Sequence, residues 1–389
     1  ASLSRDQQEL ELHIALAITW QGVGGGQIPK VKKAYTRARE LCEKLNKPAG
    51  LAQVLGGLSI FYYVRADHHT AKDLAEEAFN LAVSIKDPLL MMLCNWYLGF
   101  IQFCLGEFTA SLEHLRQVIE SYDYQRHRQG LVQLRGSDAG LGAMAYEACC
   151  LWCLGYPDQA LKRSQETLDL AREYGHPFTL ADVFCFAGCL FSSMKRDASN
   201  LEKESNALML LAKEASLTGW LATGTRYRGE ALILQGKLQE GAAQAYEGIG
   251  SMRSENIGIY VTGTLATLVE AQIKAEHLED GLATLGEAFA VVEQTDERYW
   301  EAELYRLKGK LLLMDRDVTG GEACFHKAME IACKQSAKSL ELRAAMDLCR
   351  LWQQKGKNSQ AKKLLEEIYN WFTEGFDTPD LLEAKALLD

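Results

Sequence analysis

Three closely spaced cysteines are the residues of this sequence that most resemble a metal-binding or redox group. Cys149, Cys150 and Cys153 lie within the apolar run 143–154, which predicts a buried helix. No histidine stands at the spacing that would complete a zinc site. The chain has 11 cysteines, an odd number scattered along its length, which is not the pattern of a disulfide framework. We therefore expect these cysteines to pack in the core as small apolar residues.

No string in the sequence matches a nucleotide-binding or catalytic motif. A phosphate-binding loop requires two glycines that flank four residues and precede Lys and Ser or Thr, and no such string occurs. The glycine-rich run 22–26 follows a helical segment and not a strand, so we interpret it as a turn between helices. Nothing resembles the nucleophile elbow of hydrolases. The sequence predicts a protein that is not an enzyme, with no catalytic residue, no cofactor and no metal.

A repeat of about forty residues organises the chain. Short turns follow apolar helical runs, and consecutive turns are separated by 40, 49, 41, 40, 40, 40 and 40 residues. A small residue five positions after most turns would let two helices approach closely. Each unit is therefore predicted to be a helix, a tight turn and a second helix. The turns fall at Ala66, Gly106, Gly155, Arg196, Gly236, Glu276, Arg316 and Gly356.

The repeat predicts an all-α fold. The strings Tyr97-Leu98-Gly99 and Arg228-Gly229 resemble the first-helix signature of the tetratricopeptide repeat. All six prolines fall at predicted helix starts, where a missing N–H costs nothing, and strand-type alternation is absent. We expect a right-handed superhelix of about nine extended tetratricopeptide-like helix pairs. It would form one solenoid over 1–389, with a capping helix at 379–388, in which each pair contacts only its neighbours.

The concave face of such a superhelix is the expected binding surface. First helices line it, so the candidates lie three, six and ten residues before each turn. These residues are aromatic in the first half and charged in the second, and the charged arginines could clamp a carboxylate or phosphate. The alternative is that the aromatic residues form core between repeats and the arginines pair with Glu230 or Glu270. The candidates are Trp96, Phe100, Phe103, Trp152, Arg226, Glu230, Arg306, Lys310 and Arg350.

One insertion of about nine residues breaks the period, within 123–140. This loop is locally basic in an acidic chain, and insertions in solenoids often lie on the binding side. One interpretation is an anion-binding or contact loop. The other is a structural loop whose last carboxylate caps the next helix. The residues concerned are Arg126, His127, Arg128, Arg135 and Asp138.

Charge and hydropathy exclude some partners. Lysine and arginine number 42 against 52 acidic residues, a formal charge of −10, which argues against nucleic acid or an anionic membrane as the main partner. The longest apolar stretches, such as 89–94, are far too short to span a bilayer, and no signal sequence opens the chain. We expect a cytoplasmic location.

Several strings also resemble a known family. Residues 154–161 (LGYPDQAL), 299–310 (YWEAELYRLKGK) and 371–378 (WFTEGFDT) are similar to the C-terminal repeat region of bacterial predicted ATPases linked to class III adenylate/guanylate cyclase domains. The resemblance extends over essentially the whole chain. It implies a sensor or partner-binding role for the repeats, with the chemistry in ATPase or cyclase modules that this chain does not contain.

The sequence predicts one function and leaves a second one as the alternative. The first is a non-enzymatic interaction or sensor domain that binds a protein or peptide in its groove, with the parent's own ATPase or cyclase domains as one candidate partner. The second is a superhelix that senses a small metabolite and regulates the attached module. The sequence does not decide the oligomeric state.

Overall fold

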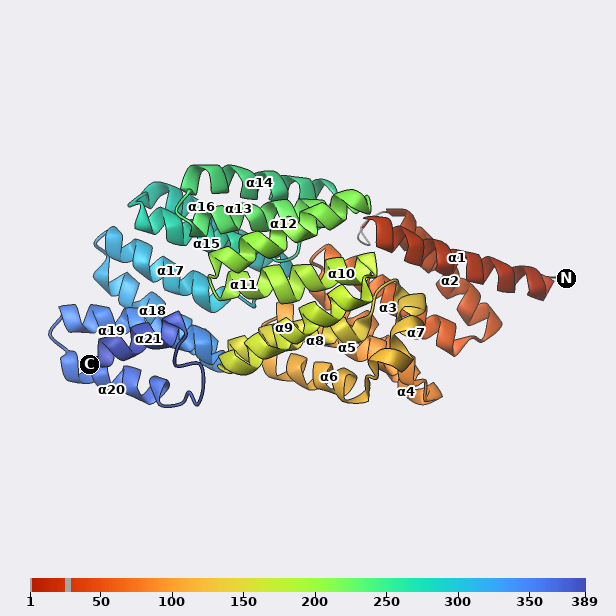
Figure 1. The fold of residues 1–389 in the computed structure, drawn as a ribbon, viewed down its shortest axis with the longest axis horizontal. Coiled ribbons are helices and arrows are strands. Elements are labelled where there is room, and N and C mark those ends of the chain that lie inside the picture. The colour runs from red at the N-terminus through yellow and green to blue at the C-terminus, as the bar shows by residue number, and fades with distance from the viewer. Residues whose placement is uncertain (1, 25–28) are drawn as a thin grey trace.

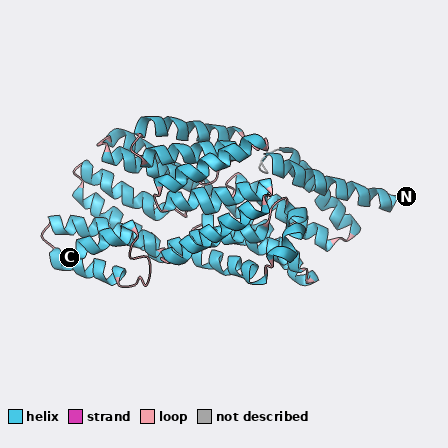
Figure 2. Ribbon diagram, viewed as in Figure 1, coloured by secondary structure: helices cyan, strands magenta, loops and turns pink. Residues whose placement is uncertain are grey.

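The computed structural model describes residues 2–24 and 29–389, and within these ranges the regular elements are all helices, with no strand (Figure 2). The glycine-rich run 22–26 continues into residues 25 and 26, which lie outside the described residues. The predicted all-α fold is confirmed for the described part of the chain.

Nine helix pairs follow one another in the described ranges, as the forty-residue period predicts. Figure 1 shows the first pair at one end of the molecule and the last pair at the other. The pairs are α1 (Ser2–Gly24) with α2 (Pro29–Leu45), α3 (Pro48–Val64) with α4 (His68–Ile85), α5 (Pro88–Cys104) with α6 (Phe108–Ser121), α8 (Ala139–Leu154) with α9 (Pro157–Tyr174), α10 (Pro177–Val183), η1 (Phe184–Leu190) and α11 (Phe191–Met194) with α12 (Ala198–Glu214), α13 (Thr218–Leu234) with α14 (Leu238–Ser254), α15 (Val261–Lys274) with α16 (Leu278–Thr295), α17 (Glu301–Met314) with α18 (Val318–Lys334), and α19 (Lys338–Gln354) with α20 (Asn358–Tyr369).

The eight predicted turns all contain a left-handed residue. Each turn residue named from the sequence has a positive φ, from 58° at Arg196 to 94° at Gly155. Glycine adopts this conformation without strain, whereas a residue with a Cβ pays a small conformational cost. The period therefore reflects one backbone geometry that is repeated at every turn. Glycine favours this geometry, but other residues also adopt it.

First and second helices differ in burial. Every residue of α8 is buried, whereas α6 buries only one stripe that includes Leu112 and Leu115. A first helix is covered on all sides because it lies between neighbouring pairs, so it carries almost no polar face. Close approach within a pair depends on small residues: a Cβ on Gly241 would lie 2.6 Å from the backbone nitrogen of Ile233.

The insertion at 123–140 is largely a helix and not a loop. Helix α7 (Tyr124–Arg135) begins at the N-cap Asp123 and ends at Gly136, whose φ is 94°. Asp138 then caps α8 by accepting hydrogen bonds from the amides of Gly140 and Leu141. The capping interpretation of Asp138 is confirmed, and the expected loop is corrected to a twelve-residue helix.

Pairs that lie five apart along the chain also contact one another. The carbonyl oxygens of Val64, Cys104 and Trp152, at the ends of three first helices, accept hydrogen bonds from donors five pairs later. These donors are the amide of Gly258 (2.8 Å), the amides of Arg298 (2.8 Å) and Tyr299 (3.0 Å), and the hydroxyl of Ser339 (2.5 Å). The expectation that each pair contacts only its neighbours is wrong, because the superhelix winds tightly enough for successive turns to satisfy each other's free helix-end carbonyls.

The hydrogen-bonded contacts between pairs that lie five apart form a seam. The C-terminal segment adds to this seam. The Glu374 carboxylate accepts hydrogen bonds from the amides of Asp158 (3.0 Å) and Gln159 (3.1 Å), so it caps α9 from more than two hundred residues away. Helix α21 (Pro379–Leu388), where the capping helix was predicted, packs against α19 and α20. The C-terminal part of the chain therefore joins the last helix pair to the fourth.

Candidate functional site

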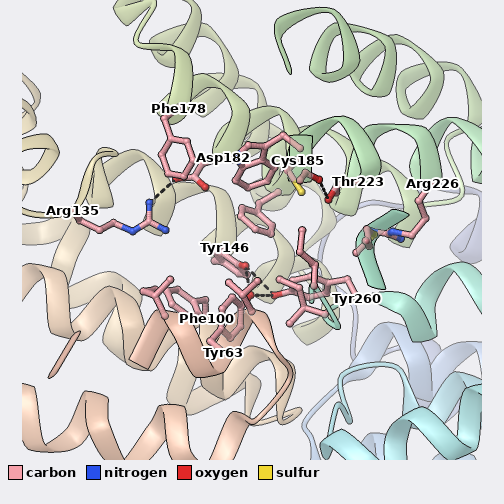
Figure 3. A pocket seen from close by; sticks show the side chains of 18 of the residues that line it. Tyr63, Phe100, Arg135, Tyr146, Phe178, Asp182, Cys185, Thr223, Arg226 and Tyr260 are labelled. Carbon is pink, nitrogen blue, oxygen red and sulfur yellow. Dashed lines mark hydrogen bonds and ion pairs between the residues drawn. The ribbon is translucent and has the colours of Figure 1, made fainter. Parts of the chain in front are cut away.

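A pocket lies at the centre of the superhelix, where the first helices of five consecutive pairs converge. Its walls come from α3, α5, α8, α10 with η1, and α13, together with α7, α14 and the turn before α15 (Figure 3). Its cavity volume is about 70 Å³, and its empty space is about 790 Å³ when solvent in the opening is included. The surface is mostly apolar, with few polar groups, which is typical of a small-molecule site.

Three tyrosine hydroxyls form the base of this pocket. The hydroxyl of Tyr63 lies 2.9 Å from that of Tyr146 and 3.0 Å from that of Tyr260, and Tyr260 donates to Tyr146 at 2.9 Å. Tyr260 reaches this place because its own φ is 59°, at the start of α15. Burial raises the pKa of all three phenols well above the ordinary value, so the base of the pocket is neutral.

An ion pair stands on one wall of the pocket. Arg135, the last residue of α7, donates from Nη1 to an oxygen of Asp182 at 3.1 Å and to the hydroxyl of Ser137. Its guanidinium lies 4.4 Å from the ring centre of Trp96 and 5.6 Å from that of Phe178. Burial raises the pKa of Asp182 although Arg135 opposes that change. Both distances are within the range of cation–π contacts, which attract the guanidinium toward these rings.

A second arginine faces the pocket from the opposite side (Figure 3). Arg226 is 1% exposed, donates to the hydroxyl of Thr264, and lies 3.9 Å from Glu230. Burial lowers the pKa of Arg226, but Tyr227 and Glu230 together raise it above the ordinary value. Glu230 is itself buried and accepts hydrogen bonds from hydroxyl groups, including that of Thr264 at 2.8 Å. The charge of this arginine is therefore compensated by Glu230, although its Nε is buried without a hydrogen-bond partner.

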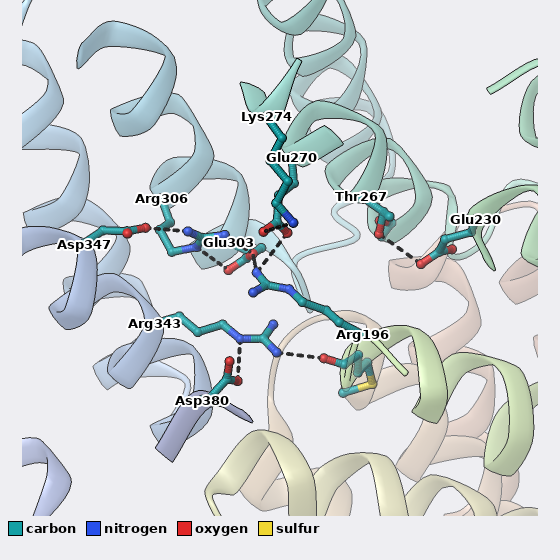
Figure 4. Close-up of polar contacts among 12 residues, drawn as sticks. Arg196, Glu230, Thr267, Glu270, Lys274, Glu303, Arg306, Arg343, Asp347 and Asp380 are labelled. Atoms are coloured by element: carbon teal, nitrogen blue, oxygen red, sulfur yellow. Dashed lines mark hydrogen bonds and ion pairs between the residues drawn. The ribbon is translucent and has the colours of Figure 1, made fainter. Parts of the chain in front are cut away.

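Of the charged candidates in the second half, Arg306 belongs to a separate ionic cluster (Figure 4). Glu303 accepts hydrogen bonds from Arg196 at 2.7 Å and from two nitrogens of Arg306, at 2.7 and 2.9 Å. Arg306 also pairs with Asp347, and Arg196 lies 3.1 Å from Glu270. Burial would raise the pKa of Glu303, but Arg306 and Arg196 hold it well below the ordinary value. These charges neutralise one another inside the protein.

The structure brings four of the predicted residues to the pocket: Trp96, Phe100 and Arg226 from the groove set, and Arg135 from the insertion. The remaining groove candidates lie elsewhere. Phe103 and Trp152 are buried in the seam, Glu230 stands behind Arg226, and Arg306 lies in the ionic cluster with Lys310 and Arg350 at its edge. The predicted arginine clamp is divided, since Arg226 and Arg306 each pair with carboxylates of their own.

The other insertion residues lie on the outer surface of α7. Arg126 is exposed, and His127 accepts a hydrogen bond at Nδ1 from the amide of Asp123 at 3.0 Å. Arg128 lies over the rings of Tyr124 and Tyr174, 4.7 and 5.0 Å from their centres. His127 and Arg128 therefore stabilise α7 and its N-terminus, and none of the three residues lines the pocket.

Sequence reasoning missed several pocket residues. Asp182 is the one carboxylate within the apolar stretch 177–194, and an isolated charge in such a run could have indicated a site. Tyr63, Tyr146 and Tyr260 come from three distant pairs, and only the winding of the superhelix brings their hydroxyls together. No signal in the sequence predicted that these three hydroxyls would meet.

Other chemistry is scarce in the described residues. No group of three or more His, Cys, Asp or Glu side chains in this part of the chain could hold a metal ion. Cys149, Cys150 and Cys153 are buried, as expected for core residues, and burial raises the pKa of each thiol. One stretch, 177–194, is long and apolar enough to cross a membrane, although 83% of it is buried as in a core helix.

Comparisons with known proteins identify the fold. No protein-family profile matches the chain. Protein R02095 of Rhizobium meliloti (strain 1021), described as uncharacterized, is 24% identical over 289 residues, which is 72% of this chain and 27% of that protein. The chain thus spans about a quarter of the length of this curated relative.

Two solved structures are similar over nearly the whole chain. A Rap protein complexed with Competence and Sporulation Factor has a TM-score of 0.65 at 9% identity, and covers 93% of this chain and 97% of its own. The apo form of the quorum sensor NprR from B. thuringiensis has a TM-score of 0.54 at 12% identity, covering 95% of this chain and 99% of its own. At such low identity these similarities show the fold, which is that of tetratricopeptide-like helical-repeat proteins.

Proposed function

We propose that this chain is the ligand-sensing helical-repeat part of a longer signalling protein, and that its ligand binds in the central pocket. The observation that carries the proposal is the pocket's position, enclosed by five consecutive first helices and by the turn before α15. The chain itself performs no catalysis in this proposal. The resemblance to repeat regions of cyclase-associated ATPases supports an ATPase or cyclase as the regulated module.

The shape of the interior favours a small ligand over an extended peptide. Most of the predicted groove residues are buried against other side chains, so the concave face offers an enclosed pocket and not a long channel. The cavity volume of about 70 Å³ is below the roughly 300–1,000 Å³ of a drug-sized ligand pocket. It therefore suits a small metabolite that extends into the open mouth, or one side chain of a larger ligand. Of the two functions left open by the sequence, small-molecule sensing is therefore the leading one.

A protein or peptide ligand remains the second candidate. It is supported by the similarity in fold to a Rap protein whose structure contains Competence and Sporulation Factor. Such a ligand would lie on the rim and insert one side chain into the pocket.

The pocket is also placed to relay a binding event. Ile257 and Tyr260 line it, and Gly258 between them donates its amide to the carbonyl of Val64 across the seam. A ligand would therefore contact both turns of the superhelix and change how they are held together. A tenfold change in population needs only about 1.4 kcal/mol of differential affinity, so even a weak ligand could signal.

A pocket-filling variant tests the proposal. Thr223 lines the pocket and is 6% exposed, so Thr223→Phe would occupy the space that a ligand needs. Thr109→Phe makes the same change on the exposed surface of α6 and is the matched control. Each protein is dialysed against a bacterial metabolite extract, and the retained compounds are identified by mass spectrometry.

We expect at least one compound to be retained by the wild type and by Thr109→Phe but lost with Thr223→Phe. Circular dichroism and thermal unfolding establish that the variants are folded. If folded Thr223→Phe retains the same compounds as the wild type, the pocket is not the binding site and the proposal is wrong.

A further inference from the structure

We propose that the pocket binds a monocarboxylate with an aromatic or branched aliphatic body, and that Arg135 is the residue that holds its carboxylate. This inference rests on the proposed function, in which the pocket is the ligand site. It adds the chemical class of the ligand and the residue that selects it.

The apolar lining specifies the body of the ligand. Ile60 and Val64 from α3, Phe186 from η1, and Met252 and Ile257 from the α14 end all face the cavity. A ring or branched chain placed there leaves water for an apolar surface, which is favourable by about 25 cal/mol per Å² buried. A second charged group on the ligand would have to lie against these side chains without a partner, which is costly.

The unused edge of Arg135 specifies the charged end. Both hydrogen bonds of this guanidinium leave from Nη1, toward Asp182 and Ser137. Nε is buried without a hydrogen-bond partner, and Nη2 donates to no residue that the structure describes. Nε and Nη2 together form the fork that binds a carboxylate through two parallel hydrogen bonds. Cation–π contacts with Trp96 and Phe178 already restrain this guanidinium.

The other charges at the pocket are less available to a ligand. Arg226 also has a buried Nε without a hydrogen-bond partner, but its side chain is 1% exposed, against 11% for Arg135. Arg226 pairs with Glu230, which also accepts hydrogen bonds from Thr264 at 2.8 Å and Thr267 at 3.0 Å. Asp182 has one arginine partner and would have to hold a cationic ligand in competition with it. An anion at Arg135 instead adds a partner to a donor that lacks one. The geometry therefore favours a carboxylate over an amine.

This assignment also gives the insertion a role. Arg135 is the last residue of α7, the helix that breaks the forty-residue period, and Gly136 ends that helix directly after it. A ligand bound to Arg135 would hold the C-terminal end of α7 against the pocket. The insertion would thus carry the residue that recognises the ligand and would move with its binding.

The test uses three probes with one carbon skeleton: 3-phenylpropionate, 3-phenylpropionamide and 3-phenylpropylamine. Isothermal titration of the whole chain measures their affinities for the wild type, Arg135→Gln, Arg135→Lys and Arg128→Gln. Arg128 is the matched control, because it lies on the same helix and over two aromatic rings but outside the pocket. Thermal unfolding of each ligand-free protein checks that it is folded.

We expect the acid to bind at least about tenfold more tightly than the amide, and the amine to be the weakest. Arg135→Gln should weaken acid binding by about 10- to 100-fold, as for the loss of a charge-assisted hydrogen bond. Arg135→Lys, which keeps the charge but loses the fork, should fall between. Arg128→Gln should leave the affinity unchanged.

The assignment is overturned if the acid binds no better than the amide, or if folded Arg135→Gln binds the acid as tightly as the wild type. Tighter binding of the amine would assign the pocket to cations held by Asp182. If none of the probes binds while Thr223→Phe still loses a retained metabolite, the chemical class is wrong and the proposed function stands. If Thr223→Phe also has no effect, both fail.

Discussion

The aromatic pocket and the ionic cluster are both buried inside one superhelix, yet they are built differently. Around the pocket, rings and neutral hydroxyls leave a cavity, and the Arg135 fork has an edge without a partner. Around Glu303 and Arg306, each charge is paired with others. Buried ions must saturate one another, whereas rings are too rigid to fill every space between helices. The comparison teaches that the apolar pocket can accept a ligand, whereas the ionic cluster stabilises the structure.

The largest expected effect is at the centre of the ionic cluster. Arg306→Met would leave Glu303 and Asp347 buried without that partner, so we expect the free energy of unfolding to fall by about 3–5 kcal/mol. Urea denaturation followed by circular dichroism measures the loss. Arg350→Met removes a half-exposed partner of the same Asp347 and should cost less than about 1 kcal/mol. Equal losses in both variants would contradict the contrast drawn here.

The second expected effect is the protonation of His68, which packs against the pocket residue Tyr63. His68 is 1% exposed beside the ring of Tyr63, and burial lowers its pKa from 6.5 to about 4. Because the unfolded chain binds this proton more readily, the stability contributed by neutral His68 is complete above about pH 6.5. It is lost as the pH falls toward 4, by about 3 kcal/mol.

His68→Gln tests this expectation. Its free energy of unfolding should fall less steeply than that of the wild type between pH 7 and 4, measured by urea denaturation at each pH. Parallel pH curves for the two proteins would show that His68 does not titrate in this range. The loss of stability at low pH would then not come from this buried ring.

The smallest effect is at the tyrosine base of the pocket. Tyr260→Phe keeps the ring but removes the hydroxyl that donates to Tyr146 and accepts from Tyr63, so we expect a loss of about 1 kcal/mol. Tyr246→Phe, at a side chain that is 40% exposed, is the matched control and should change stability by less. If Tyr260→Phe lowered the free energy of unfolding more than Arg306→Met, the pocket and not the ionic cluster would be the more important for stability.

The helices and their period could be predicted because local chemistry determines them. Glycine and other turn residues, proline at helix starts and Asp N-caps such as Asp87 and Asp138 act over a few residues, and the observed boundaries follow them. The insertion is a helix and not the expected loop, and the sequence does not show this because α7 buries only Leu131 fully and has little apolar periodicity. The sequence signal for such a helix is weak.

The site was only partly predictable. Counting back from the turns placed Trp96, Phe100 and Arg226 on the concave face, where the structure has them. The same rule could not separate residues that line a cavity from residues that fill it, such as Phe103. That distinction depends on how tightly the superhelix winds, which is set by contacts between pairs five apart and has no local signature.

The seam between these distant pairs changes how the molecule should unfold. A linear array can lose terminal repeats one at a time, since each repeat depends only on its neighbours. Here the hydrogen bonds from Ser339 to Trp152 and from Asp158 to Glu374 join residues about two hundred positions apart. Removing the last pair would strip partners from the fourth, so shortened chains should melt as a whole, and folding should be slowed by the high contact order. This repeat protein should therefore fold cooperatively, as a globular domain does, and not one repeat at a time.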